Sequence, residues 1–82
     1  MYEIDFDELD KNKHDKLIID LRLKEDFEHD NYPGSINIPW RDFDTHLDNM
    51  PKDRPVYLIC KTGHDSLYLA DHLQSTGVEA YS

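Results

Sequence analysis

Short runs of apolar residues alternate with polar segments along the whole of this chain. Residues 17–19 and 56–59 are continuous apolar runs, which is typical of strands that are buried on both faces of a parallel sheet. Residues 35–38 alternate apolar and polar positions and stop at Pro39, which favours a third and shorter strand. Two further short strands are predicted, over residues 1–4 and 78–81.

Helical segments are predicted between these strands. Asp5 is a suitable cap for a short helix near the N-terminus. Residues 24–28 fit one or two helical turns, and residues 41–49 carry apolar side chains at helical spacing. Residues 66–73 show the same spacing, and Ser66 is a good N-cap for that helix.

The alternation of strands and helices predicts an α/β fold. We expect three layers, with a mostly parallel sheet and helices on both of its faces. A length of 82 residues indicates one small domain, residues 1–82. Because a chain of this size buries only about 60–65% of its unfolded surface, we expect a thin margin of stability.

Acidic side chains outnumber basic ones, with 18 Asp and Glu against 9 Lys and Arg and a net charge of −9. This balance argues against nucleic acid and against an anionic membrane surface as partners, because both require a basic face. No stretch has the apolar length of a membrane span, and the N-terminus lacks the pattern of a signal peptide. A single cysteine cannot form an internal disulfide, so we expect a reducing, cytoplasmic location.

That cysteine, Cys60, lies where the strand over residues 56–59 ends and a short loop leads to the helix at Ser66. The backbone N–H groups of such a loop can point inward and bind an anion, and a Cys60 thiolate or persulfide would be one. Gly63 supplies the backbone freedom that a sharp loop requires. The alternative is that Cys60 is only a small buried hydrophobic residue.

Three segments resemble the rhodanese-like (sulfurtransferase) domain family. Residues 17–22 resemble the family's strand that ends in Asp-x-Arg. Residues 27–39 resemble its glycine-turn segment, and residues 56–66 resemble the strand and catalytic loop, with the pattern Cys-x-x-Gly-x-x-Ser. The resemblance covers about residues 3–81 and implies the α/β fold of that family.

The resemblance implies a sulfurtransferase in which Cys60 is the nucleophile and holds sulfane sulfur as a persulfide. The donor would be thiosulfate or a protein persulfide, the acceptor a thiol, and no cofactor is implied. Loop amides would lower the pKa of the thiol. Asp20 and Arg22 match family positions near the site, and they fit a structural ion pair equally well. The implied active-site loop consists of Lys61, Thr62, Gly63, His64, Asp65 and Ser66.

The chain departs from the family in two respects. Many active members carry arginine at the fifth position after the cysteine, where this chain has Asp65. An arginine there binds an anionic donor, whereas a carboxylate repels it by about 1–4 kcal/mol. We therefore expect weak thiosulfate activity, or a different donor such as a protein persulfide. The chain also lacks the family's usual C-terminal segment and final helix, which we expect to expose apolar surface and favour self-association.

Two other functions compete with sulfur transfer. A catalytically weak or inactive rhodanese-like binding or regulatory module is the stronger alternative, and Asp65 favours it. Phosphatases of the same fold carry arginine six residues after the cysteine, where this chain has Ser66. Without that arginine there is no bidentate clamp for phosphate, so a phosphatase is disfavoured.

We expect no metal site, because the five histidines are scattered and Cys60 lacks a second cysteine at zinc-site spacing. His64 is expected to be exposed to solvent. Trp40 and Tyr32 are expected to pack beneath the turn at residues 33–34 rather than to bind a ligand.

Overall fold

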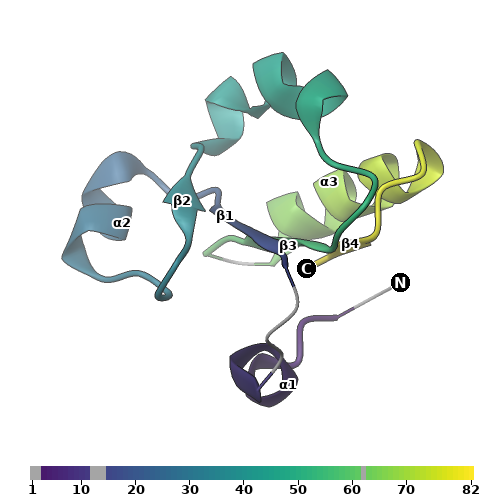
Figure 1. The fold of residues 1–82 in the computed structure, drawn as a ribbon. Coiled ribbons are helices and arrows are strands. Elements are labelled where there is room, and N and C mark those ends of the chain that lie inside the picture. Colours follow the sequence, from purple (N-terminus) through teal and green to yellow (C-terminus); the bar gives the residue numbers. More distant parts are fainter. Residues whose placement is uncertain (1–2, 12–14, 62) are drawn as a thin grey trace.

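A four-stranded parallel sheet lies at the centre of the computed structural model (Figure 1). The structure describes residues 3–11, 15–61 and 63–82. Its elements, in chain order, are α1 (Phe6–Lys11), β1 (Leu17–Asp20), α2 (Lys24–His29), β2 (Ile36–Asn37), η1 (Trp40–Asn49), β3 (Val56–Ile59), α3 (His64–Ser75) and β4 (Ala80–Tyr81). The four strands predicted after residue 16 are all confirmed, although β2 and β4 are shorter than the sequence suggested.

The strand order is β2-β1-β3-β4, so β1 and β3 form the centre of the sheet. All four residues of each central strand are paired, and Asp20 at the end of β1 lies beside Ile59 at the end of β3. Beyond this pair, the Leu21 N–H donates to the Ile59 carbonyl at 2.7 Å. The residues that follow β1 and β3 therefore meet at the carboxyl edge of the sheet, where ligands bind in open α/β folds.

Two hydrophobic clusters cover the two faces of the sheet. The larger cluster packs η1 and α3 against one face, and its fully buried members include Ile19, Phe43, Val56, Leu58 and Leu73. The smaller cluster packs Leu9 of α1 against Ile18 and Tyr57 on the other face. Neighbours Ile18 and Ile19 serve different clusters because successive strand side chains point to opposite faces. The predicted three-layer α/β fold is confirmed.

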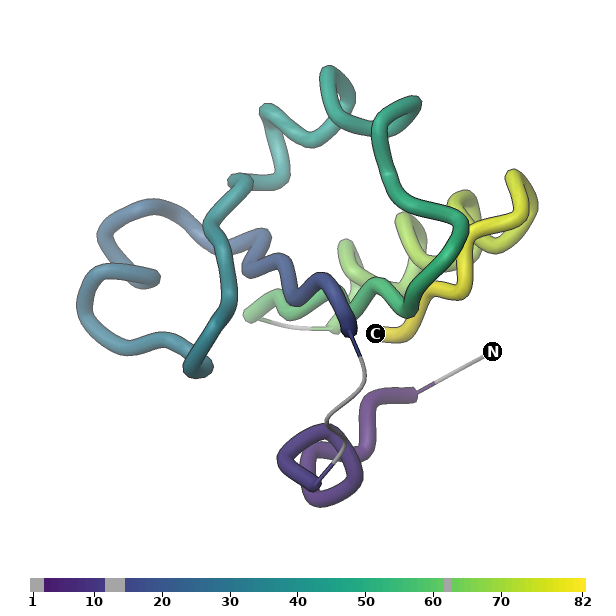
Figure 2. Tube along the Cα trace, in the orientation of Figure 1, coloured from purple at the N-terminus to yellow at the C-terminus, as the bar shows by residue number. Residues whose placement is uncertain are grey.

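The two ends of the described chain come close together, as the tube in Figure 2 illustrates. The Ile4 N–H donates to the Ser82 carbonyl at 2.7 Å. This single bond does not extend into a ladder, and Glu3 and Ile4 lie outside any strand. The predicted strand over residues 1–4 is therefore wrong for Glu3 and Ile4, and residues 1–2 lie outside the described part of the chain.

The helices largely follow the sequence prediction. The Asp5 side chain caps α1, since its Oδ1 accepts from the N–H groups of Asp7 and Glu8 at 3.0 and 3.2 Å. The helix predicted over residues 41–49 is present as the 3-10 helix η1. Half of its ten residues are Asp, Asn or Thr, whose side chains bond to the local backbone and compete with α-helical geometry. The helices of the described chain are too short or too polar to span a bilayer.

Candidate active site

Cys60 lies directly after β3, at the edge where β1 and β3 both end. Its side chain is partly buried and packs against the larger hydrophobic cluster. It also lines two surface hollows, so it is not sealed in the core. The predicted arrangement of strand, cysteine loop and helix is confirmed, with α3 starting at His64.

Backbone amides point at the Cys60 sulfur. The Gly63 N–H donates to Sγ at 3.0 Å, and the Ser66 N–H donates to it at 3.4 Å. The Sγ atom also lies 3.3 Å from the Ser66 hydroxyl oxygen. The partial positive charge of these N–H groups, at the start of α3, favours an anionic sulfur over the neutral thiol. The predicted amide cradle is thus present for Gly63 and Ser66, while Thr62 lies outside the described residues.

The start of α3 differs from the sequence prediction. Gly63 occupies the N-cap position with a left-handed backbone, φ +82°, and the helix begins at His64. Ser66 is therefore not the N-cap, and it lies in the first turn with only 2% of its surface exposed. The reason is the sharp turn at Gly63, which lets the helix start earlier and directs the Ser66 N–H to the sulfur. His64 is exposed, as predicted.

Replacing Gly63 with alanine is expected to slow alkylation of Cys60 at neutral pH several-fold. A side chain at φ +82° is strained by about 1–2 kcal/mol, and relaxing this strain rotates the amide that contacts Sγ. Gly34 is a matched control, because its φ is +86° and an added Cβ meets no atom within 4 Å at either glycine. Both variants should lose similar stability in urea, and only Gly63→Ala should change the iodoacetamide rate. Equal rates would show that this amide does not activate the sulfur.

Asp20 and Arg22 form an ion pair at the end of β1. The Asp20 carboxylate is buried and accepts from Arg22 Nη2 at 2.8 Å, from Nε at 3.0 Å and from the backbone N–H at 2.9 Å. Asp30 adds a second carboxylate, 3.3 Å from Arg22 Nη1. The hydrogen bonds to Asp20, and then those to Asp30, hold the pKa of Arg22 above its usual value. The pair fixes the end of β1 next to the cysteine loop.

A hollow of about 270 Å³ lies beside Cys60, and we call it the larger Cys60 hollow. Its apolar wall consists of Leu21, Leu23, Pro39 and Trp40. Its charged residues are Arg22, Asp26, Arg41, Lys61 and Asp65. Of the predicted site residues, the structure brings Cys60, Arg22, Lys61 and Asp65 to this hollow. Asp20 holds Arg22 in place, and His64 is not part of the lining.

The expectation that Trp40 packs beneath the glycine turn is wrong. Trp40 lines the larger Cys60 hollow, and 38% of its surface is exposed. Its backbone N–H donates to the Leu21 carbonyl at 3.0 Å, which fixes Trp40 beside the end of β1. Tyr32 instead packs beside α1, and the centroid of its ring lies 5.8 Å from that of the Phe6 ring. One sequence signal could have placed Trp40, since it follows a strand end just as Cys60 does.

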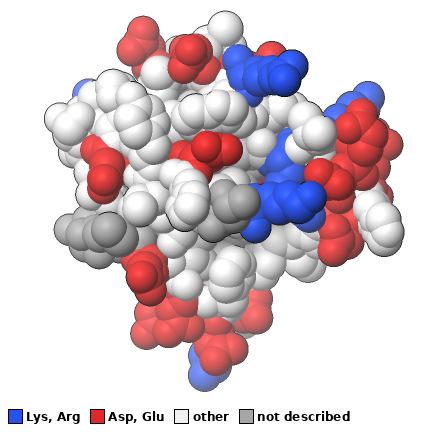
Figure 3. All heavy atoms as spheres, turned by 180° about the vertical axis from the view of Figure 1, so that it is seen from behind, with Lys and Arg blue, Asp and Glu red and all other residues white. Residues whose placement is uncertain are grey.

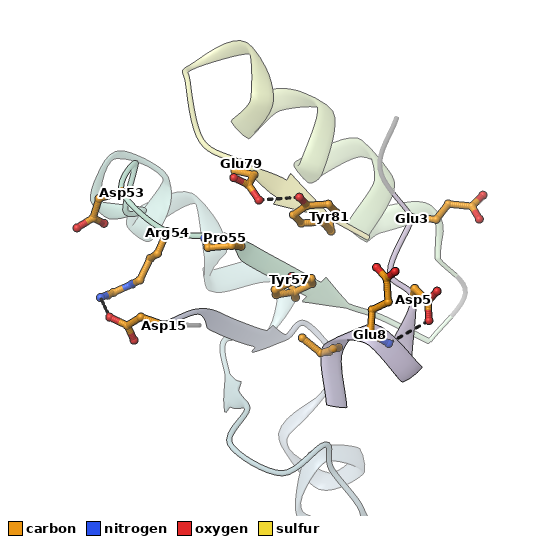
Figure 4. Close-up of a pocket in the computed structure, with 11 residues that line it drawn as sticks. Glu3, Asp5, Glu8, Asp15, Asp53, Arg54, Pro55, Tyr57, Glu79 and Tyr81 are labelled. Atoms are coloured by element: carbon orange, nitrogen blue, oxygen red, sulfur yellow. Dashed lines mark hydrogen bonds and ion pairs between the residues drawn. The ribbon is translucent and has the colours of Figure 1, made fainter. Parts of the chain in front are cut away.

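A more voluminous hollow of about 570 Å³ lies away from the cysteine loop (Figure 4), and we call it the acidic hollow. The rings of Tyr57 and Tyr81 stack in it with their centroids 4.9 Å apart. Burial raises the pKa of Tyr57, and the negative charges of Glu79 and Glu8 raise it further. Its acidic lining residues are Glu3, Asp5, Glu8, Asp15, Asp53 and Glu79. Acidic side chains are spread over the face of the molecule that is seen from behind Figure 1 (Figure 3), so acidity alone does not mark a site here. Within the described ranges, no three His, Cys, Asp or Glu residues gather closely enough to hold a metal ion.

Comparisons with known proteins agree with this geometry. The family model described as Rhodanese-like domain matches residues 5–82. The chain is 42% identical over 76 residues to a tRNA sulfurtransferase of Desulfurococcus amylolyticus, covering 93% of this chain and 15% of that protein. It is 33% identical over 76 residues to an adenylyltransferase and sulfurtransferase UBA4 of Yarrowia lipolytica, covering 90% and 19%. The chain therefore spans less than a fifth of the length of these two relatives.

Solved structures support the same assignment of the fold. A rhodanese-like domain protein from Staphylococcus aureus superposes with a TM-score of 0.83 at 25% sequence identity. The superposition covers 99% of this chain and 82% of that chain. The arrangement of the sheet and helices therefore follows a known fold.

Proposed function

The chain belongs to the rhodanese-like domain family, and from this premise we propose that residues 1–82 act as one sulfur-carrying domain with Cys60 as the nucleophile. The observation that carries the proposal is the pair of N–H groups, from Gly63 and Ser66, directed at Cys60 Sγ. Such donors stabilise a thiolate before the reaction and a persulfide anion after it. Relatives named as sulfurtransferases support the same chemistry.

The proposed reaction has two steps. In the first, the Cys60 thiolate attacks the outer sulfur of a persulfide donor R–S–SH. A bond forms between the two sulfurs, and the donor S–S bond breaks with its electron pair leaving on RS⁻. In the second step, an acceptor thiolate attacks the outer sulfur of the Cys60 persulfide, takes it as R′–S–SH and returns Cys60 as a thiolate. Thiosulfate can replace the first donor, with sulfite leaving. No net oxidation occurs in either route, and no cofactor is needed.

The loop residues have distinct proposed roles. Gly63 and Ser66 donate hydrogen bonds to the sulfur, and Lys61 offsets part of the negative charge of Asp65 in the same hollow. Thr62 and His64 are the remaining residues of the proposed active-site loop. Asp20 and Arg22 support the site from the neighbouring strand. The acceptor is a thiol, and the chemistry suits a reducing compartment such as the cytoplasm.

Mass spectrometry of the intact protein tests this proposal. After incubation with inorganic polysulfide and removal of the excess, the chain should carry one added sulfur atom, and a small thiol should remove it. If polysulfide, thiosulfate and cysteine persulfide all fail to add sulfur, the binding or regulatory module becomes the better description.

Asp65→Arg is expected to raise kcat/KM for thiosulfate about tenfold or more, since it replaces repulsion of about 1–4 kcal/mol with attraction in the larger Cys60 hollow. The assay is thiosulfate:cyanide sulfur transfer. Asp71→Arg is the matched control, because Asp71 is exposed on the same helix and outside that hollow, and the net charge changes equally. Equal gains in both variants would mean that overall charge, rather than position 65, limits the use of thiosulfate.

A further inference from the structure

Large apolar side chains that remain exposed gather around the cysteine. The described chain exposes five of them, Phe6, Leu23, Ile36, Trp40 and Tyr68. Leu23 and Trp40 line the larger Cys60 hollow, and Tyr68 lies edge-on to Trp40 with ring centroids 6.3 Å apart. Only Ile36 takes no part in these surroundings. Exposed apolar patches that cluster in this way mark interaction sites.

A second hollow flanks Cys60 on another side, and we call it the smaller Cys60 hollow. It measures about 140 Å³ and is lined by Phe6, Ile59 and Ser66 among others. Both hollows include Cys60 in their lining, so they adjoin at this residue. A donor as small as thiosulfate can occupy one hollow only. A ligand that fills both must be extended, with its reacting sulfur near its middle.

The charges around the larger Cys60 hollow are nearly balanced. Arg22, Arg41 and Lys61 face Asp26 and Asp65, and Arg22 is already paired with Asp20 and Asp30. This pattern does not suit a polyanion, because nucleic acids require an excess of basic groups. It suits a largely uncharged segment whose apolar side chains pack against Trp40 and Tyr68, because aromatic anchors supply much of the binding energy in protein interfaces.

We propose that the two Cys60 hollows and the rim formed by Leu23, Trp40 and Tyr68 bind an extended polypeptide segment with a central cysteine and apolar flanks. This inference rests on the proposed function, since that cysteine carries the sulfur as its persulfide. The apolar flanks occupy the hollows on either side of Cys60. Transfer follows the first step given above, and the partner's cysteine leaves as its thiolate.

Binding can be measured without transfer in the Cys60→Ser variant. Trp40 is the only tryptophan of the chain, so its fluorescence reports on the larger Cys60 hollow. The probes are three pools of octapeptides with a central cysteine and apolar, acidic or basic flanks. Peptides with apolar flanks should bind at least tenfold tighter than both charged pools, and Tyr68→Ala should weaken their binding several-fold. Ile36→Ala is the control, because Ile36 is also an exposed apolar side chain, at 46% against 68% for Tyr68, but is not part of the rim, and it should have no effect.

The outcomes separate this inference from the proposed function. If polysulfide loads Cys60 but no pool changes the Trp40 fluorescence, or a charged pool binds best, the docking surface is wrong and sulfur transfer stands. If peptides with apolar flanks bind but no donor loads Cys60, sulfur transfer is wrong and the surface belongs to a binding module. With loading intact, a peptide persulfide should exceed cysteine persulfide in kcat/KM, and Tyr68→Ala should reduce that ratio.

Discussion

Cys60→Ser is expected to abolish sulfur loading and to reduce sulfur transfer by roughly 10³-fold or more. A serine hydroxyl fits the same space, but it is not ionised near neutral pH and forms no persulfide. The amides of Gly63 and Ser66 then have only a neutral oxygen to contact. Intact-mass measurement after polysulfide treatment and a steady-state transfer assay together check this result. Stability should change little, because the substitution removes no large apolar group.

Cys60→Ser also removes the only thiol of the chain, so loss of activity alone would not show that the position matters. A second variant that combines Cys60→Ser with Ser75→Cys places an exposed thiol at the far end of α3. We expect this thiol to alkylate only as fast as an ordinary exposed cysteine and to give no turnover. If the relocated cysteine restored transfer to within tenfold of the original chain, the amide cradle would be unnecessary and the proposed mechanism would be wrong.

Much of the fold could be predicted because local sequence and tertiary structure agree. The runs 17–19 and 56–59 are apolar at every position, as central parallel strands require, and they became the centre of the sheet. The Asp5 side chain caps α1 by bonding to backbone two and three residues further along the chain, so this role depends on local sequence. Cys60 could be placed at the carboxyl edge of the sheet because the strand before it was clear.

Other features depend on geometry that the residue types do not specify. Ser66 has good N-cap chemistry, but the left-handed turn at Gly63 decides where α3 begins. Trp40 could be expected near the edge of the sheet because it follows a predicted strand, but its exact position beside Cys60 depends on a backbone hydrogen bond to Leu21, 19 positions earlier in the chain. Likewise, the contact between Arg22 and Asp30 forms only because the chain turns back after α2.

Asp20→Ala is expected to lower the free energy of unfolding by about 2–4 kcal/mol. The Asp20 carboxylate is 1% exposed and accepts hydrogen bonds from both the side chain and the backbone N–H of Arg22. Its removal leaves the guanidinium, which is itself only 20% exposed, without its main partner. Asp30→Ala is the matched control, because Asp30 also contacts Arg22 but is 78% exposed, and its loss should cost below about 1 kcal/mol. Urea unfolding at neutral pH checks both variants.

A double-mutant cycle distinguishes an energetic role of the ion pair from mere proximity. Arg22→Met keeps an apolar stem and removes the charge that Asp20→Ala would leave uncompensated, so the double variant should be more stable than the sum of the single losses implies. The coupling should reach about 1 kcal/mol or more, as for residues in one hydrogen-bonded network. Strict additivity would mean that Asp20 acts only through its bond to the Arg22 N–H, which Arg22→Met retains. The end of β1 would then be held by backbone geometry rather than by the guanidinium.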